Sequence, residues 1–181
     1  ISGNLRHCGP ESDAMVDHEL QQLAEVIGRT LVEKGHILGF AESCTGGLAS
    51  ATVTNIPGSS AWFDAGVVTY SNQAKTECLG VPEGLIQTYG AVSEPVAKAM
   101  AEGAQINAGV DLAISITGVA GPTGGTKDKP VGTVCFGWVI RNAAGKTVTS
   151  CQTKLFNGNR QAIRQQATEH ALAVLVRLLN D

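Results

Sequence analysis

Hydrophobic positions recur every three to four residues in three long segments, and this spacing predicts helices. The segments are residues 17–34, about 93–107 and about 160–179. The first stops at Gly35, and the second starts at Ser93, a capping hydroxyl that is followed by an acid and a proline. Two shorter helices are expected, one from Gly46 onward and one over residues 72–79.

Short apolar runs between these helices predict the strands of a sheet. The runs are residues 37–41, 64–70, 111–117, 131–140 and 147–156. Residues 141–146 connect the last two runs as a hairpin turn, which makes that pair of strands antiparallel. The alternation predicts an α/β layered domain, with helices on both faces of a mixed, mostly parallel sheet that carries an antiparallel hairpin.

Length, charge and hydropathy narrow the class of protein. A chain of 181 residues is expected to form one domain, which we assign to residues 17–181, with residues 1–16 as an N-terminal extension outside the fold. A net charge of -3 provides no basic face for nucleic acid. No apolar stretch reaches the roughly 18 residues that span a bilayer, and no signal peptide is recognisable, so we expect a cytoplasmic protein without a membrane partner.

Cysteines and histidines indicate neither a disulfide framework nor a metal site. The 5 cysteines include no C-x-x-C pair and leave one over, which favours reduced thiols. The 4 histidines are scattered without a partner at ligand spacing, so no metal is expected.

The most informative polar segment is 42–47, Glu-Ser-Cys-Thr-Gly-Gly, between a predicted strand and a predicted helix. Ser43 therefore lies at a strand-to-helix turn and is a candidate nucleophile. Unpaired backbone N–H groups of Thr45, Gly46 and Gly47 are expected to hold an oxyanion beside it. The alternative interpretation is a helix N-cap followed by a glycine turn.

Two further loops are expected at the same edge of the sheet, because ligands of α/β folds bind beyond the carboxyl ends of the parallel strands. One loop supplies Tyr70 and Lys75, and the other is the glycine-rich segment 118–125. No histidine lies in these loops, so Lys75 is the candidate base, since burial can lower the pKa of a lysine. Tyr70 is expected to orient that amine or to relay the proton. The alternatives are a solvated lysine, a tyrosine at the rim and a flexible surface loop.

Spacing excludes several familiar sites. Tyr70 and Lys75 are separated by four residues, whereas the pair of the short-chain dehydrogenases is Y-x-x-x-K. Gly125-Thr126-Lys127 inverts the order of a Walker A loop, and neither the dinucleotide fingerprint G-x-G-x-x-G nor the nucleophile elbow G-x-S-x-G is present. The glycine-rich segment still allows close backbone approach to a ligand such as a phosphate.

Six segments resemble, in order along the chain, the C-terminal domain family of competence/damage-inducible protein A. They are ESCTGG (42–47), PGSSAWF (57–63), VTYSNQAK (68–75), GAVSEPV (90–96), TGVAGPTGG (117–125) and KPVGTV (129–134). Family members that occur as a lone domain are nicotinamide mononucleotide amidohydrolases, which act in pyridine nucleotide salvage, and the resemblance implies this activity here. Larger relatives add an N-terminal pyrophosphatase-like domain, for which 181 residues are expected to leave no room.

The resemblance also implies roles for particular residues. Ser43 corresponds to the nucleophile of the family, and Tyr70 and Lys75 to the tyrosine and lysine that act with it. Thr117 and Arg160 correspond to residues linked with the substrate, although the residue before the arginine is asparagine where the family more often has aspartate.

Together these residues suggest a reaction. Neutral Lys75, assisted by the neighbouring tyrosine, takes the proton of Ser43 as the serine oxygen attacks the carboxamide, and water then hydrolyses the acyl-enzyme. No cofactor is needed. Arg160, with Gly118 and Gly121, is expected to bind the ribose phosphate; alternatively, the arginine caps its helix or faces solvent.

Three other hypotheses remain open. Cys44 could be the nucleophile, since a thiol at a helix start has a lowered pKa. The chain could bind a phosphorylated metabolite without turnover. It could also act in DNA uptake or repair, as the name of the family suggests. The negative net charge of the chain disfavours this hypothesis, because DNA is itself negatively charged. The sequence does not determine the oligomeric state, so a homo-oligomer is one further possibility.

Overall fold

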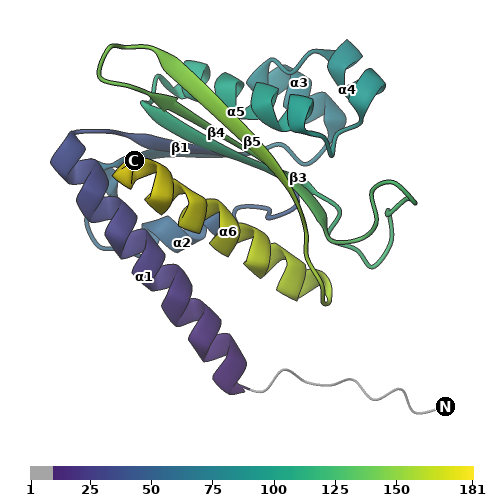
Figure 1. Cartoon of the computed structure of the whole chain (residues 1–181), viewed down its shortest axis with the longest axis horizontal. Helices are drawn as coiled ribbons and strands as arrows, with labels where there is room; N and C mark the ends of the chain where they lie inside the picture. Colours follow the sequence, from purple (N-terminus) through teal and green to yellow (C-terminus); the bar gives the residue numbers. More distant parts are fainter. Residues whose placement is uncertain (1–9) are drawn as a thin grey trace.

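Figure 1 shows the computed structural model of the chain, which describes the backbone of residues 10–181 and the side chains from residue 17. The helices are α1 (Pro10–Lys34), α2 (Leu48–Thr54), α3 (Asn72–Leu79), α4 (Glu83–Tyr89), α5 (Glu94–Ala108) and α6 (Arg160–Asn180). The strands are β1 (Leu38–Glu42), β2 (Phe63–Val68), β3 (Leu112–Gly118), β4 (Thr133–Arg141) and β5 (Thr147–Leu155).

The strands form one mixed sheet in the order β2-β1-β3-β4-β5. β1 is parallel to both β2 and β3, whereas β4 is antiparallel to β3 and to β5. Strands β1, β2, β3 and β5 therefore point the same way, and only β4 opposes them. This confirms the predicted α/β fold with its antiparallel hairpin. The carboxyl ends of β1, β2 and β3 meet at one edge of the sheet.

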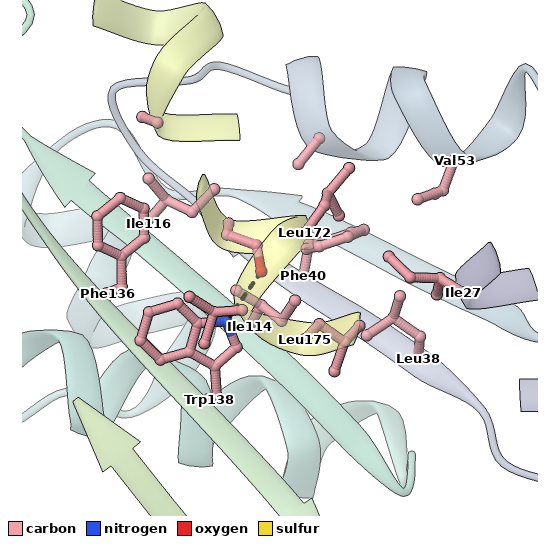
Figure 2. Packing of buried hydrophobic residues seen from close by; sticks show 14 of the residues in the cluster. Ile27, Leu38, Phe40, Val53, Ile114, Ile116, Phe136, Trp138, Leu172 and Leu175 are labelled. Atoms are coloured by element: carbon pink, nitrogen blue, oxygen red, sulfur yellow. Dashed lines mark hydrogen bonds between the residues drawn. The ribbon is translucent and has the colours of Figure 1, made fainter. Parts of the chain in front are cut away.

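Helices cover both faces of the sheet, and each face has its own apolar core. Helices α1, α2 and α6 lie on one side, where they pack on Phe40, Ile114 and Phe136, and Trp138 donates to the Ala171 carbonyl oxygen at 3.0 Å (Figures 1 and 2). Helices α3, α4 and α5 lie on the opposite side over a second cluster. Both cores are built from alternate residues of the same strands, as the period of two along a strand requires.

Two helices differ from the prediction. Helix α1 begins at Pro10 rather than at residue 17, because a proline fits the first turn of a helix, where its missing N–H is not needed. It thus extends into the segment assigned to the extension, and residues 1–9 lie outside the described residues. Helix α4 was not predicted. It is 7 residues long and begins after Pro82, and only two of its residues are aliphatic, which is too few to show a helical period.

Candidate active site

The three loops predicted to converge line one cavity of about 270 Å³ at the carboxyl ends of β1, β2 and β3, together with Ala91, Val92 and the start of α6. The turn after β1 contributes Ser43 and Cys44, and the segment after β2 contributes Tyr70, Asn72 and Lys75. The end of β3 and the loop after it contribute Thr117, Gly118, Val119, Ala120, Gly121, Thr123 and Gly124, and Arg160 comes from the start of α6. The predicted convergence of the three loops is therefore present.

Ser43 and Lys75 are in direct contact. The Lys75 Nζ lies 3.0 Å from the Ser43 Oγ and donates to the carbonyl oxygen of Thr69 at 2.9 Å. Only 1% of Lys75 is exposed, and this burial lowers the pKa of its amine. The alternative of a solvated surface lysine is therefore wrong. Helix α3 determines this placement, because Ser71 caps it and its buried face carries Lys75 and Leu79, one turn apart.

Tyr70 lies at the rim of the cavity and does not hold the lysine amine. It is 61% exposed, and its hydroxyl accepts from the Arg160 Nη2 at 2.9 Å. The Lys75 amine is oriented by the Thr69 carbonyl instead. Since β2 ends at Val68, Tyr70 lies in the segment that follows the strand.

Arg160 enters the cavity from the first residue of α6. Its Nη1 donates to the Gly121 carbonyl oxygen at 2.7 Å, so the guanidinium joins Tyr70 to the loop after β3. Asn159 is the N-cap of this helix and accepts from the Ala162 N–H at 2.9 Å. The departure from aspartate at this position therefore leaves Arg160 in the site. The alternative of a capping arginine is wrong, because Asn159 caps the helix, whereas the alternative of a solvent-facing arginine holds in part, because Arg160 is exposed at the cavity.

The backbone donors at the start of α2 differ from the prediction. The Gly47 N–H donates to the buried Glu42 carboxylate at 3.2 Å, and the Gly46 N–H donates to the Ser43 carbonyl oxygen at 3.0 Å. The Thr45 hydroxyl also donates to Glu42, at 2.7 Å. A carboxylate of the protein already occupies this helix N-terminus, because the positive end of a helix attracts the nearest anion. Gly46 and Gly47 are therefore not free to hold an oxyanion.

Two N–H groups of the turn remain. Those of Cys44 and Thr45 donate to no oxygen within the described part of the chain. The alternative of a capping segment followed by a glycine turn is present as well: the N-cap residue of α2 is Gly47, with no side-chain cap of its own, and the Glu42 carboxylate accepts from the N–H groups of Gly47, Ala49 and Ser50. Gly46 and Gly47 have φ angles of 58° and 101°, a left-handed pair that glycine adopts without strain.

Cys44 lines the cavity beside Ser43, but its thiol is poorly suited to act as the nucleophile. Only 4% of the residue is exposed, and burial raises the pKa of its thiol to about 12. This is the opposite of the lowered pKa that the cysteine hypothesis requires, because desolvation outweighs the favourable effects of the backbone and of Arg164.

The glycine-rich loop after β3 is tied down by its neighbours. The Val119 N–H donates to the Thr133 carbonyl oxygen at 2.8 Å, and the Thr117 hydroxyl donates to the Ala91 carbonyl oxygen at 2.9 Å. A Cβ on Gly121 would collide with the Val131 side chain. The loop is therefore shaped by packing on the segment before β4, and the hydroxyl of Thr117 is already engaged with the backbone.

Sequence reasoning missed the roles of Glu42 and Arg164. Glu42 holds the start of α2, and Arg164 donates to the carbonyl oxygens of Cys44 and Thr45. One signal for the arginine was available: it stands four residues after Arg160, one helical turn along the same face. For Glu42 the sequence contains no such indication, because a carboxylate before a turn can point into the protein or toward solvent.

Among the residues that the structure describes, no three His, Cys, Asp or Glu side chains gather as a metal ion would require. Over the same residues, no helix is both long and apolar enough to cross a bilayer.

The sequence of this chain is similar to those of known proteins. Residues 20–179 match the family model described as the CinA C-terminal domain. Nicotinamide-nucleotide amidohydrolase PncC of Escherichia coli K12 is 49% identical over 161 residues, which cover 89% of this chain and 95% of the relative. A protein of Symbiobacterium thermophilum with a competence-damage inducible name is 49% identical over 163 residues, which cover 88% of this chain but 38% of that longer protein.

The fold is similar to solved structures as well. The crystal structure of competence damage-inducible protein A from Klebsiella pneumoniae superposes with a TM-score of 0.83 at 37% identity. The match covers 89% of this chain and 97% of that chain.

Proposed function

The chain belongs to the CinA C-terminal domain family, and from this premise we propose that it hydrolyses the carboxamide of nicotinamide mononucleotide to nicotinic acid mononucleotide and ammonia. The similarity to the E. coli amidohydrolase, over most of both chains, supports this class of substrate. The observation that carries the proposal is the buried contact of 3.0 Å between the Lys75 Nζ and the Ser43 Oγ. Such a pair supplies a nucleophile and a base without a histidine.

In the acylation step, the neutral amine of Lys75 accepts the hydroxyl proton of Ser43 while the serine Oγ bonds to the carboxamide carbon. The C–N bond of the resulting tetrahedral intermediate then breaks. The leaving nitrogen takes the proton back from Lys75 and departs as ammonia. The acyl group remains on Ser43 as an ester, and the lysine is again neutral.

Deacylation repeats these steps with water. Lys75 takes a proton from the attacking water and returns it to the Ser43 Oγ as the ester bond breaks, which releases the nicotinate nucleotide. The burial of Lys75 serves both steps. A lysine with the reference pKa of about 10.4 is neutral in only about one molecule in 2,500 at pH 7, and each unit by which burial lowers that pKa increases the neutral fraction about tenfold.

We assign the oxyanion to the N–H groups of Cys44 and Thr45. They are the donors of the Ser43 turn that no protein oxygen accepts from in the described part of the chain. This replaces the expectation that Gly46 and Gly47 form the oxyanion site.

The charge of the cavity suits the phosphate of a nucleotide. The Arg160 guanidinium lines the cavity, and within the described residues no carboxylate does. We propose that the Arg160 guanidinium binds the phosphate through charge-assisted hydrogen bonds, and its contacts with Tyr70 and Gly121 support this role because they hold it at the cavity. We propose a small-molecule substrate and no nucleic-acid partner.

The test is ammonia release from nicotinamide mononucleotide by the wild type, Ser43→Ala and Lys75→Ala, with rapid quench and mass spectrometry to detect the acyl group on the Ser43 peptide. A chelator is present throughout. We expect turnover and a trapped ester in the wild type and neither in Ser43→Ala. Saturable binding without ammonia from any protein would show a binding module. Activity retained in Ser43→Ala and lost in Cys44→Ala would transfer the nucleophile to the thiol.

A further inference from the structure

A buried carboxylate gathers the donors at the start of α2. Glu42 is fully buried, and its Oε1 accepts from the Thr45 hydroxyl at 2.7 Å and from the Ala49 N–H at 3.0 Å, besides the Gly47 N–H. Its Oε2 accepts from the N–H and the hydroxyl of Ser50, at 3.0 and 2.7 Å. Five donors compensate the desolvation of this charge, which would otherwise be strongly unfavourable. The residue before the nucleophile is thus bonded to the residues that follow it.

A partly buried guanidinium also contacts this turn. Arg164 lies on α6, about 120 residues further along the chain, and its Nε donates to the Cys44 carbonyl oxygen at 3.0 Å. Its Nη2 donates to the Thr45 carbonyl oxygen at 2.9 Å. Arg164 does not line the cavity, whereas Arg160, one helical turn earlier, does. Arg160 and Arg164 therefore differ in what they contact: Arg160 lines the cavity, and Arg164 donates to the backbone of the turn.

We propose that Glu42 and Arg164 are positioning residues for the nucleophile, an inference that rests on the proposed function. The carboxylate takes the hydroxyl and N–H donors after Ser43, the guanidinium takes the carbonyl oxygens of Cys44 and Thr45, and the Ser43 N–H donates to the Ile116 carbonyl oxygen at 2.9 Å. Among the described residues, no oxygen accepts from the remaining N–H donors of this turn, those of Cys44 and Thr45.

This arrangement has two consequences for the reaction. It holds the Ser43 Oγ at its distance from the Lys75 Nζ, and it leaves the N–H groups of Cys44 and Thr45 without an acceptor oxygen among the described residues. Displacement of a reacting atom by about 1 Å can reduce the rate on the order of 100-fold. Loss of either support should therefore slow the chemical step and leave substrate affinity unchanged, because neither side chain lines the cavity.

The experiment compares Glu42→Gln and Arg164→Lys with Arg160→Lys. The glutamine keeps the size of the side chain but presents an NH₂ group to the Ser50 donors, and the lysine keeps the charge but cannot bridge two carbonyl oxygens. For the first two variants we expect kcat to fall on the order of 100-fold, with KM and the affinity for nicotinic acid mononucleotide within about twofold of the wild type. For Arg160→Lys we expect the reverse, a raised KM.

Matched controls are Glu25→Gln on α1 and Arg177→Met on α6, both exposed and remote from the cavity, which should behave as the wild type. Because both proposed residues act through one turn, the double variant Glu42→Gln/Arg164→Lys should lose little more kcat than the worse single variant. An unchanged kcat in Arg164→Lys, or a raised KM with kcat retained, overturns the proposal. If Glu42→Gln does not fold, Arg164→Lys decides alone.

A separate readout distinguishes this proposal from the proposed function. The rate at which a fluorophosphonate labels Ser43 depends on the turn and on Lys75 but not on the substrate. If the wild type releases no ammonia from nicotinamide mononucleotide, the proposed function fails, and slower labelling of both variants still supports the positioning role. Labelling at the wild-type rate in folded Arg164→Lys overturns it.

Discussion

Replacing Lys75 with methionine should abolish activity and stabilise the fold. Methionine keeps most of the length and volume of the buried side chain but has no amine. The general base is then missing, and such a group typically contributes about 10²- to 10⁴-fold to a rate. The substitution also removes a buried group that can carry charge, whose desolvation costs several kcal/mol. Two hydrogen bonds are lost, to Ser43 and to Thr69, at about 1 kcal/mol each.

The balance predicts a gain of about 1–3 kcal/mol in the free energy of unfolding at pH 7, or an increase of roughly 2–10 °C in the melting temperature. The gain should depend on pH. Burial lowers the pKa of Lys75 in the folded state, so between that pKa and about 10.4 the unfolded chain binds more protons than the folded one. Wild-type stability therefore rises with pH across this window, whereas that of Lys75→Met does not, and the advantage of the variant shrinks.

The assay is urea unfolding of both proteins at pH 7 and pH 10, together with ammonia release at pH 7. Lys98→Met is the control, because this lysine is exposed on α5 and its contact with Glu102 is long, at 3.9 Å. Ammonia release near the wild-type rate would refute Lys75 as the base. A variant less stable than the wild type at pH 7, or an advantage that does not change with pH, would refute the argument from burial.

Three further substitutions test other parts of the site. Tyr70→Phe removes the hydroxyl that accepts a hydrogen bond from Arg160, and in steady-state kinetics it should raise KM several-fold with little effect on kcat. A kcat reduced more than 100-fold would instead indicate that the tyrosine takes part in proton transfer. Cys44→Ala should keep most activity, and iodoacetamide should not inactivate the wild type at pH 7, because the thiol has a pKa of about 12; rapid inactivation by alkylation at this residue would contradict this. Gly118→Ala should lower the free energy of unfolding by about 1–3 kcal/mol in urea titration, since the new Cβ would lie 2.7 Å from a side-chain atom of Val134; unchanged stability would show that the strands separate easily.

The local elements that the sequence predicted best are those with strong start and stop signals. Helix α3 spans residues 72–79 as expected, because Ser71 caps it and Gly80 ends it in a left-handed conformation. Helix α5 starts at the cap Ser93 for the same reason. Helix α4 has neither a side-chain cap nor a clear apolar period, so its existence depends on the packing of Ile86.

The contact between Ser43 and Lys75 could be anticipated from topology. Both residues follow strands that were predicted to be parallel, and β1 and β2 are in fact neighbours, with Glu42 paired to Val68. Segments that leave the same edge of adjacent parallel strands must lie close together. The contacts of Arg160 with Tyr70 and of Arg164 with Cys44 could not be derived in this way, because they bridge 90 and 120 residues and depend on where α6 packs.

The sequence by itself determined the alternation of helices and strands, the edge of the sheet at which the candidate active site lies, and the serine and lysine that are in contact there. These follow from local periodicity, capping and strand order, which act over a few residues. Only the tertiary structure decided that Glu42 occupies the helix start, that Tyr70 pairs with Arg160 rather than with the lysine, and that burial makes Lys75 a weaker base and Cys44 a weaker acid. The direction in which a polar side chain points, and the extent to which a charged group is removed from water, depend on residues that are distant in sequence. No local sequence pattern encodes them.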